Sequence, residues 1–163
     1  MLLLDITTFL GRLHPLVVHL PIGFLLLAVV FELLSYHKSF AYLKQAVAFT
    51  ILLGFIAASS ACLLGYILSL SGDYEYQLLN NHKVAGIIVA AGAGILYLFT
   101  TESIKSRVFI SRKIFSGLFI GLFVLITYAG HQGGNLTHGS DYLSMRVIQE
   151  QERKKPASLG EAL

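Results

Sequence analysis

Histidine is the residue in this sequence whose number and spacing suggest chemistry. A neutral imidazole can bind a metal through one ring nitrogen while its other nitrogen donates a hydrogen bond. His14 and His19 stand five residues apart in the stretch GRLHPLVVHLPIG, close to Pro15 and Pro21 at the start of a long apolar run. Ionisable side chains in such runs are costly in lipid and mark a candidate site. The remaining histidines are His37, His82, His131 and His138.

The composition indicates an integral membrane protein. Hydrophobic residues occupy 55% of the 163 positions and charged residues only 13%, and the mean hydropathy is +0.71. A water-soluble domain of this length needs more charge to cover its surface. The formal net charge of +3 is too small to indicate a nucleic-acid-binding protein. A single cysteine excludes an intramolecular disulfide, and there is no CxxCH motif for covalent haem attachment.

Four apolar runs are long enough to cross about 30 Å of hydrocarbon, which requires about 20 helical residues. Helices are expected because open strands would leave backbone groups unpaired in lipid. The sequence therefore predicts an all-α, integral membrane four-helix up-down bundle within residues 1–143, followed by a polar tail or linker at 144–163. The expected spans are residues 15–36, 40–70, 82–101 and 113–131.

The charges of the short loops predict the orientation of the bundle. The loop between the second and third spans holds Asp73 and Glu75 and neither lysine nor arginine. By the positive-inside rule, the basic loops face the cytoplasm, so both termini lie on the periplasmic side of a bacterial inner membrane. The basic residues of the other two loops are Lys38, Lys44, Lys105, Arg107, Arg112 and Lys113.

This topology gathers the histidines at the periplasmic end of the bundle, with the exception of His37 in a cytoplasmic turn. We interpret Pro15 as the first helical residue and His14, which precedes it, as a residue of the rim. Pro21 lacks a backbone donor, and the resulting bend is expected to turn His19 toward the bundle axis.

A second pattern relates His19 to His82. Each is followed four residues later by a glycine, Gly23 or Gly86. The first and third spans run in the same direction and lie diagonally across an up-down bundle. We therefore predict that His19 and His82 are the axial ligands of a b-type haem, with Gly23 and Gly86 leaving room for the flat ring.

The fourth span ends in the glycine-rich stretch TYAGHQGGNLTHGSDYL, which could turn back over the bundle. His131 and His138, with Asn135, Thr137 and Asp141, could then cap the site or orient the imidazoles through hydrogen bonds. An interfacial loop that satisfies only its own backbone is the alternative, and the sequence favours neither.

Other features have structural interpretations. Glu32, near the cytoplasmic end of the first span, is expected to pair with Lys44 across the following turn or to reach the membrane interface. Small residues at helical spacing predict close packing between helices. They are Gly54, Ala58, Ala61 and Gly65 in the second span, Gly86, Ala90, Ala93 and Gly94 in the third, and Gly117 and Gly121 in the fourth.

The stretches LGRLHPLVVHLPIG, YQLLNNHKVAG and GHQGGNLTHGSDYL resemble an uncharacterised four-span bacterial membrane domain family with L-H-P-L-x-V-H-x-P-I and H-x-G-G-x-L-T-H-G-x-x-Y-L motifs. The resemblance covers about residues 8–144. Family members often precede a planctomycete-type c-type cytochrome module, which implies a periplasmic c-type cytochrome as electron partner. This sequence reaches Leu163 without that module. The family's histidines correspond to His14, His19, His82, His131 and His138.

Three functions remain open. The first is an electron-transfer module with b-type haem, which passes electrons between quinol and a periplasmic cytochrome. The second is a zinc, copper or iron ion site completed by a carboxylate such as Asp73 or Asp141. The third is a cofactor-free membrane anchor or assembly subunit, in a homo- or hetero-oligomer. No hydrolase or transferase motif is visible, so any enzyme activity would be that of a redox subunit.

Overall fold

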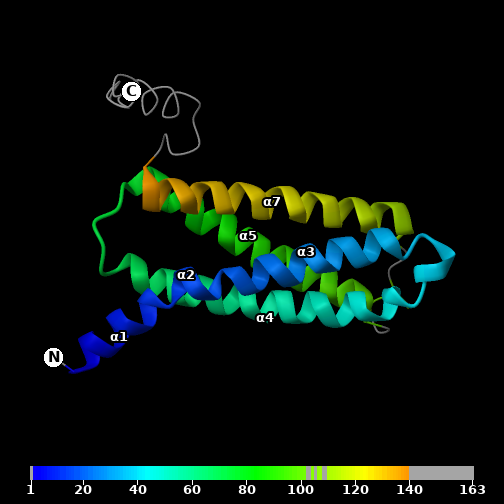
Figure 1. Ribbon diagram of the computed structural model, residues 1–163, viewed down its shortest axis with the longest axis horizontal. Coiled ribbons are helices and arrows are strands. Elements are labelled where there is room, and N and C mark those ends of the chain that lie inside the picture. The colour runs from blue at the N-terminus through cyan, green and yellow to red at the C-terminus, as the bar shows by residue number, and fades with distance from the viewer. Residues whose placement is uncertain (1, 102–103, 105, 108–109, 140–163) are drawn as a thin grey trace, which may run out of the picture.

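The computed structural model describes residues 2–101, 104, 106–107 and 110–139. Asp141 and the predicted tail at 144–163 lie outside these residues. The regular elements of the described part are helical (Figure 1). They are α1 (Leu2–Arg12), α2 (His14–Val17), α3 (His19–Leu34), the 3-10 turn η1 (Lys38–Phe40), α4 (Leu43–Ser69), α5 (Tyr76–Thr100) and α7 (Arg112–His138).

Among the described residues, four helical segments are long and apolar enough to cross a membrane, which confirms the predicted number of spans. The first begins at Ile6, because α1 leads almost without interruption into α2 and α3. Pro15 lies in the first turn of the short α2, where its missing N–H is tolerated, so it does not begin the span. The spans are Ile6–Leu34, Leu43–Ser69, Tyr76–Thr100 and Arg112–His138.

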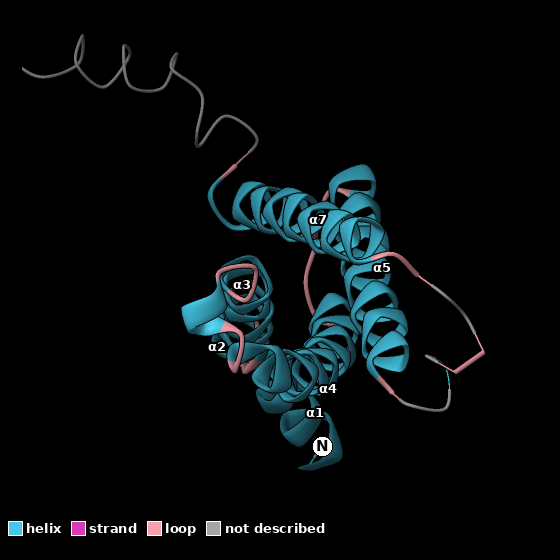
Figure 2. Ribbon diagram, turned by 90° about the vertical axis from the view of Figure 1, so that its right-hand side faces the viewer, coloured by secondary structure: helices cyan, strands magenta, loops and turns pink. Residues whose placement is uncertain are grey.

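The long helices alternate in direction and enclose a common core. α3 packs between α4 and α7, and α5 packs between the same two helices on the opposite side. Figure 2 shows this arrangement along the bundle, with α3 diagonal to α5 and α4 diagonal to α7. The up-down four-helix bundle is thus confirmed.

The core occupies the middle of the bundle, where each long helix contributes residues with little or no exposed area. Leu25, Ile51, Ala93 and Phe119 lie at its centre. The outer surface is rich in exposed leucine, isoleucine, valine and phenylalanine. A surface of this kind suits a lipid environment, where apolar side chains need no cover.

Small residues in α4 and α5 lie at helix contacts, as predicted. A β-carbon at Gly54 would overlap the side chain of Leu25, and one at Gly94 would lie 3.0 Å from the ring of Phe55. The prediction is wrong for Gly117 of α7, where nothing lies within 4 Å of a built β-carbon. The same holds for Gly121.

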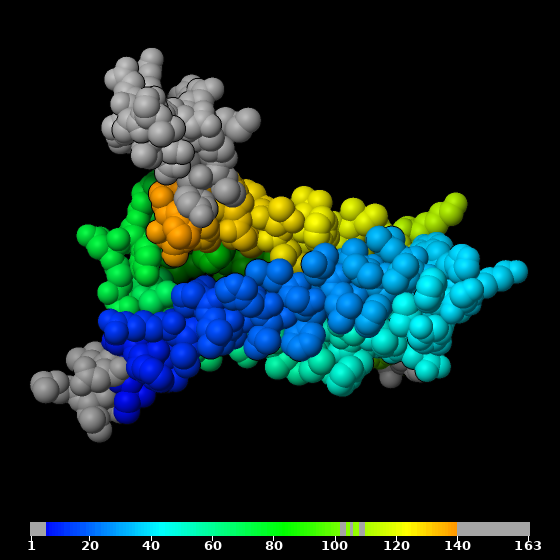
Figure 3. Space-filling view, in the orientation of Figure 1, coloured from blue at the N-terminus to red at the C-terminus, as the bar shows by residue number. Residues whose placement is uncertain are grey.

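The interface between α3 and α7 is the sparsest contact between neighbouring long helices. In the space-filling view, the first span (blue) and the C-terminal half of α7 (yellow to orange) separate toward the end that carries α1, and α5 (green) is visible between them (Figure 3). We call this boundary the α3–α7 seam.

Candidate functional site

His14 of α2 reaches across to α4. Its Nδ1 lies 2.9 Å from the carbonyl oxygen of Ala61. Because a carbonyl only accepts hydrogen bonds, Nδ1 carries the proton and Nε2 keeps its lone pair. The imidazole packs against Gly65, one turn beyond Ala61, which we call the glycine shelf. A β-carbon at Gly65 would lie 2.8 Å from Cε1 of His14. The hydrogen bond to Ala61 orients the ring, and the lack of a side chain at Gly65 leaves room for it.

His82 of α5 is held in the same way by α7. Its Nδ1 lies 3.0 Å from the carbonyl oxygen of Ala129, so this ring also keeps an uncommitted Nε2. A β-carbon at Gly133, one turn beyond Ala129, would lie 3.0 Å from Cε1 of His82. His14 and His82 thus lie on diagonal helices and have equivalent surroundings, each with one carbonyl partner and one neighbouring glycine.

The match has a fixed spacing in the sequence. Each histidine bonds to a carbonyl 47 residues further along the chain. Adding 68 to the numbers of His14, Ala61 and Gly65 gives those of His82, Ala129 and Gly133. The same offset relates buried core residues, namely Leu25 with Ala93, Ala28 with Leu96, and Ile51 with Phe119. The second half of the bundle (α5 and α7) therefore repeats the first (α2, α3 and α4) in the order of its helices and in the positions of these residues.

The two imidazoles lie against each other across the bundle, between α2 and α5. Their ring centres are 6.1 Å apart and their planes are inclined by 80°. Each ring is half-buried and contributes one nitrogen with a free lone pair. Each half of the chain thus contributes one imidazole whose Nε2 has the chemistry of a ligand donor.

The expectation that His19 faces the bundle axis is wrong. Its side chain is exposed, and its Nδ1 lies 3.3 Å from the carbonyl oxygen of Leu16 on the same helical segment. Gly23 is exposed too, with nothing within 4 Å of a built β-carbon. Gly86 is half-buried, and a β-carbon there would lie 3.6 Å from the sulfur of Cys62 on α4. His14, interpreted as a rim residue, is the one that faces His82.

A heptad pattern distinguishes the two histidines. Pro21, Leu25, Ala28 and Glu32 are buried and form one face of α3. Seven residues before Pro21, two helical turns away, the same face contains His14. His19 stands on the opposite face. The predicted bend at Pro21 does not reverse this, because the proline itself points into the bundle.

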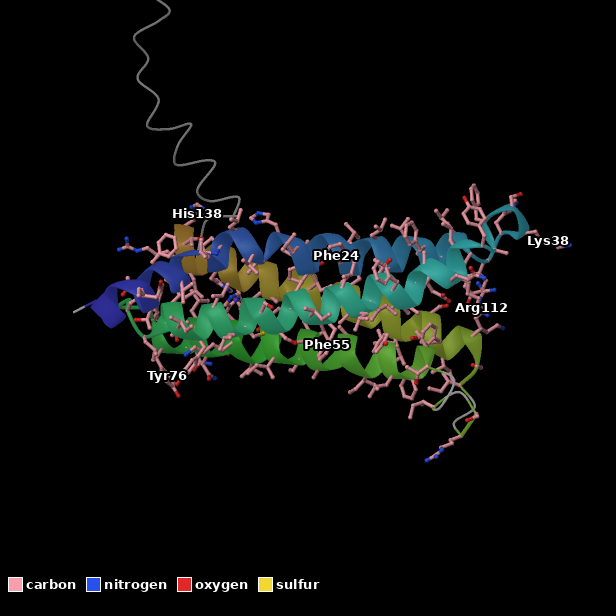
Figure 4. All side chains as sticks on the ribbon, turned by 90° about the horizontal axis from the view of Figure 1, so that it is seen from below. Phe24, Lys38, Phe55, Tyr76, Arg112 and His138 are labelled. Carbon is pink, nitrogen blue, oxygen red and sulfur yellow. The ribbon has the colours of Figure 1, made fainter. Side chains whose placement is uncertain are left out.

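The expectation of a glycine-rich loop over the site is also wrong, because α7 continues in helical form to His138. The helix ends at Gly139, whose φ of 94° favours glycine. His131 is exposed, and its Nε2 lies 3.3 Å from Nδ2 of Asn135. His138 is exposed at the last turn (Figure 4). The glycine at 133 serves helix contact, since it makes room for His82.

Asn135, like Gln132 one turn earlier, is a polar residue of α7 that is buried at this end. It is 8% exposed, and its Oδ1 is the buried side-chain oxygen of the described residues without a hydrogen-bond partner. The side chain lines a recess of about 220 Å³ with Asp73, Glu75 and Leu78. No group of three or more histidine, cysteine or acidic side chains that could hold a metal ion is found among the described residues.

A second polar cluster, which we call the Glu32 clamp, lies at the opposite end of the bundle. Glu32 of α3 is 2% exposed and accepts a hydrogen bond of 2.7 Å from the hydroxyl of Ser116 on α7. The guanidinium Nε of Arg112 lies 3.8 Å from the same carboxylate oxygen. Arg112 also donates to Ser35 at 2.8 Å and stacks on the ring of Tyr36 at 3.8 Å. The predicted pairing of Glu32 with Lys44 is therefore wrong.

Figure 4 shows the separation of the two clusters along the bundle, with Arg112 and Lys38 at one end and His138 and Tyr76 at the other. We refer to these as the clamp end and the histidine end.

The comparison with protein families adds to this geometry. A family model described as "Predicted membrane protein (DUF2231)" matches residues 12–141. The chain belongs to this family. No curated protein and no solved structure matches the chain. The DUF2231 match includes both halves of the repeat and the two carbonyl-bonded histidines, so the paired-imidazole site lies within the family domain.

Proposed function

We propose that this membrane protein is an electron-transfer module in which His14 and His82 supply the two axial ligands of a b-type haem. The observation that carries the proposal is the matched pair of imidazoles. In each ring, Nδ1 donates its proton to a backbone carbonyl and Nε2 keeps its lone pair. The centres of the two rings are 6.1 Å apart. Ligating histidines almost always have such a second hydrogen bond, which fixes the tautomer and the ring orientation.

The distance between the rings supports this donor set. Two imidazoles on opposite sides of one metal ion, each bonded at about 2 Å, have ring centres roughly 6 Å apart, because each centre lies about 1 Å behind its nitrogen. A haem iron needs only axial ligands from the protein, whereas a zinc ion takes three or four protein donors. His14 and His82 supply two donor nitrogens, which is the number that a haem iron takes from the protein.

When bound, the haem would supply a one-electron redox centre in an apolar bundle, where burial and axial ligands set the potential. The carbonyls of Ala61 and Ala129 would orient the two imidazoles. Gly65 and Gly133 would leave space for these two rings against α4 and α7. The seam between α3 and α7 offers a flat group lateral access to the axis.

The orientation of the bundle is part of the proposal. Described basic residues at the clamp end include Lys38, Lys44, Arg112 and Lys113, which the positive-inside rule assigns to the cytoplasm. The histidine end would then face the periplasm across a bacterial inner membrane. There it could exchange electrons with a periplasmic c-type cytochrome.

The test is the visible spectrum of the purified protein after addition of haem. We expect a Soret band and, on reduction, the sharp bands of a bis-imidazole haem. His14→Ala or His82→Ala should abolish this spectrum, whereas the matched control His19→Ala, on the opposite face of the same span, should leave it unchanged. Protein that stays colourless in excess haem, or a spectrum that depends on His19 and not on His14, would refute the proposal.

A further inference from the structure

The outer surface of α5 and α7 carries a recess directly behind His82. Its volume is about 200 Å³. Tyr128 precedes Ala129, whose carbonyl holds His82, and Asn81 precedes His82 itself. The lining is Asn80, Asn81, Val84, Ala85, Ile88, Leu125 and Tyr128.

The recess is apolar along most of its length and polar at one side. Val84 and Ile88 are 47% and 46% exposed on the outer surface of the bundle, so a chain leaving the recess would pass into lipid. The polar groups are the amides of Asn80 and Asn81 and the hydroxyl of Tyr128. A ligand that fits has a small polar head and an apolar body.

The polar groups of the recess have donors left over. The hydroxyl oxygen of Tyr128 accepts a hydrogen bond of 2.9 Å from Nε2 of Gln132, so its own proton is available for another acceptor. Oδ1 of Asn81 accepts from Nε2 of Gln77 at 3.2 Å, which leaves the amide N–H groups of Asn81 available. Two donors beside an apolar recess favour a ligand that carries carbonyl oxygens.

The repeat of the fold provides independent support. An offset of 68 places Leu13 and Ser60 in the first half where Asn81 and Tyr128 stand in the second. Gln132, which fixes the tyrosine hydroxyl, corresponds to Leu64. The imidazole site is repeated in both halves, but the two donors assigned to the recess are not. Leu13 has no side-chain donor, and the hydroxyl of Ser60 donates at 2.9 Å to the carbonyl oxygen of Ile56 within its own helix. Packing that both halves share therefore does not account for them.

We propose that this recess binds the head group of a membrane quinone, whose ring carbonyls accept hydrogen bonds from Tyr128 and Asn81. The site adjoins one ligand of the paired-imidazole site, so a quinone there would be the redox partner within the membrane; this role, but not the binding itself, rests on the proposed haem function.

The experiment uses the full chain in phosphatidylcholine vesicles with a photoreactive azido-ubiquinone as the probe. Labelled residues are mapped by mass spectrometry, and affinity is measured by competition with unlabelled ubiquinone. We expect labelling on α5 and α7 around Val84 and Leu125. Tyr128→Phe should weaken binding about 3- to 10-fold, the amount expected for one lost hydrogen bond. Asn81→Leu, which copies the first half of the chain, should weaken it similarly.

The control is Tyr66→Phe, which removes a hydroxyl from an exposed tyrosine of α4 outside the recess. The proposal is overturned if neither Tyr128→Phe nor Asn81→Leu changes the affinity, if the label maps elsewhere, or if labelling is insensitive to ubiquinone and falls only with the ester carbonyls of added phospholipid. Haem-free and haem-treated protein are measured in parallel. Specific labelling of colourless protein would support the recess and refute the haem, and a haem spectrum without labelling would do the reverse.

Discussion

The two ends of the bundle treat buried polar groups in opposite ways. At the clamp end, the hydroxyl of Ser116 and the guanidinium of Arg112 both face one carboxylate oxygen of Glu32, and the cluster joins α3 to α7. At the histidine end, each imidazole uses one nitrogen for a structural hydrogen bond and keeps the other free. A cluster in which charge is paired holds helices together, whereas the pair of oriented rings with one free nitrogen each is the pair that we propose as the haem ligands.

The comparison predicts that loss of charge at the clamp end will affect stability most. Arg112→Ala leaves the buried carboxylate of Glu32 without its cation. Removing one partner of a fully buried pair costs about 3–5 kcal/mol, and we expect about 3 kcal/mol here because the Arg112 side chain is 39% exposed and partly screened. The measurement is the unfolding free energy in mixed micelles.

The control for Arg112→Ala is Lys113→Ala, which removes an exposed charge from the next position. Equal losses in the two variants would contradict the assigned role of the clamp. The haem spectrum should be the same in both, because neither residue lies at the histidine end.

At the histidine end, the largest expected effect on stability comes from adding a side chain at Gly65, against the ring of His14. In Gly65→Ala the new β-carbon would lie 2.8 Å from Cε1 of His14, so the ring or the helix must shift. Overpacking of this kind costs about 1–2 kcal/mol. Haem affinity should fall with it, as a titration of the Soret absorbance would show. Gly130→Ala, with open space around it, should change neither quantity; a fall in affinity there as well would argue against a specific shelf.

A smaller effect is expected from the edge of the clamp. Tyr36→Phe removes the hydrogen bond of 2.8 Å to Ser116 but keeps the ring that Arg112 stacks on. One hydrogen bond contributes about 1 kcal/mol, so the unfolding free energy should fall by that amount. Tyr42→Phe, at a tyrosine that is 67% exposed, serves as the control. An unchanged unfolding free energy in Tyr36→Phe would contradict the assignment of the Tyr36 hydroxyl to the clamp.

The smallest effect is expected for His19→Ala. An exposed histidine with a long local contact of 3.3 Å contributes little, so the unfolding free energy should change by less than about 0.5 kcal/mol. A loss comparable to that of His14→Ala, measured in the same micelles, would show that the two histidines of the opening stretch share one role.

The sequence predicted the bundle well, because four long apolar runs leave little choice in lipid. It also names His82 and His14 among the candidate residues, and their role in binding a cofactor stays a prediction. It places His14 at the rim, and not opposite His82, because Pro15 reads as the start of the span. A proline in a first turn is compatible with helix on both sides, as the run from α1 into α3 shows. Extended back by two helical turns, the face shared by Pro21, Leu25 and Glu32 contains His14.

Two other features could not be read from local sequence. Glycines near the end of α7 suggested a turn, but a glycine in a helix can equally admit a neighbouring side chain, and only the packing of His82 decides between these. The partner of Glu32 depends on which helix lies beside α3. Lys44 is close in the chain, whereas Arg112 is close in space.

The α3–α7 seam has a consequence for how the bundle can move. Each of the other three boundaries between neighbouring long helices is bridged by a connecting segment of the chain, but no connection joins α3 directly to α7. The Glu32 clamp joins α3 to α7 at one end of the seam. If α3 and α7 separate, we therefore expect them to do so first at the histidine end, which no loop between them and no residue of the Glu32 clamp holds together.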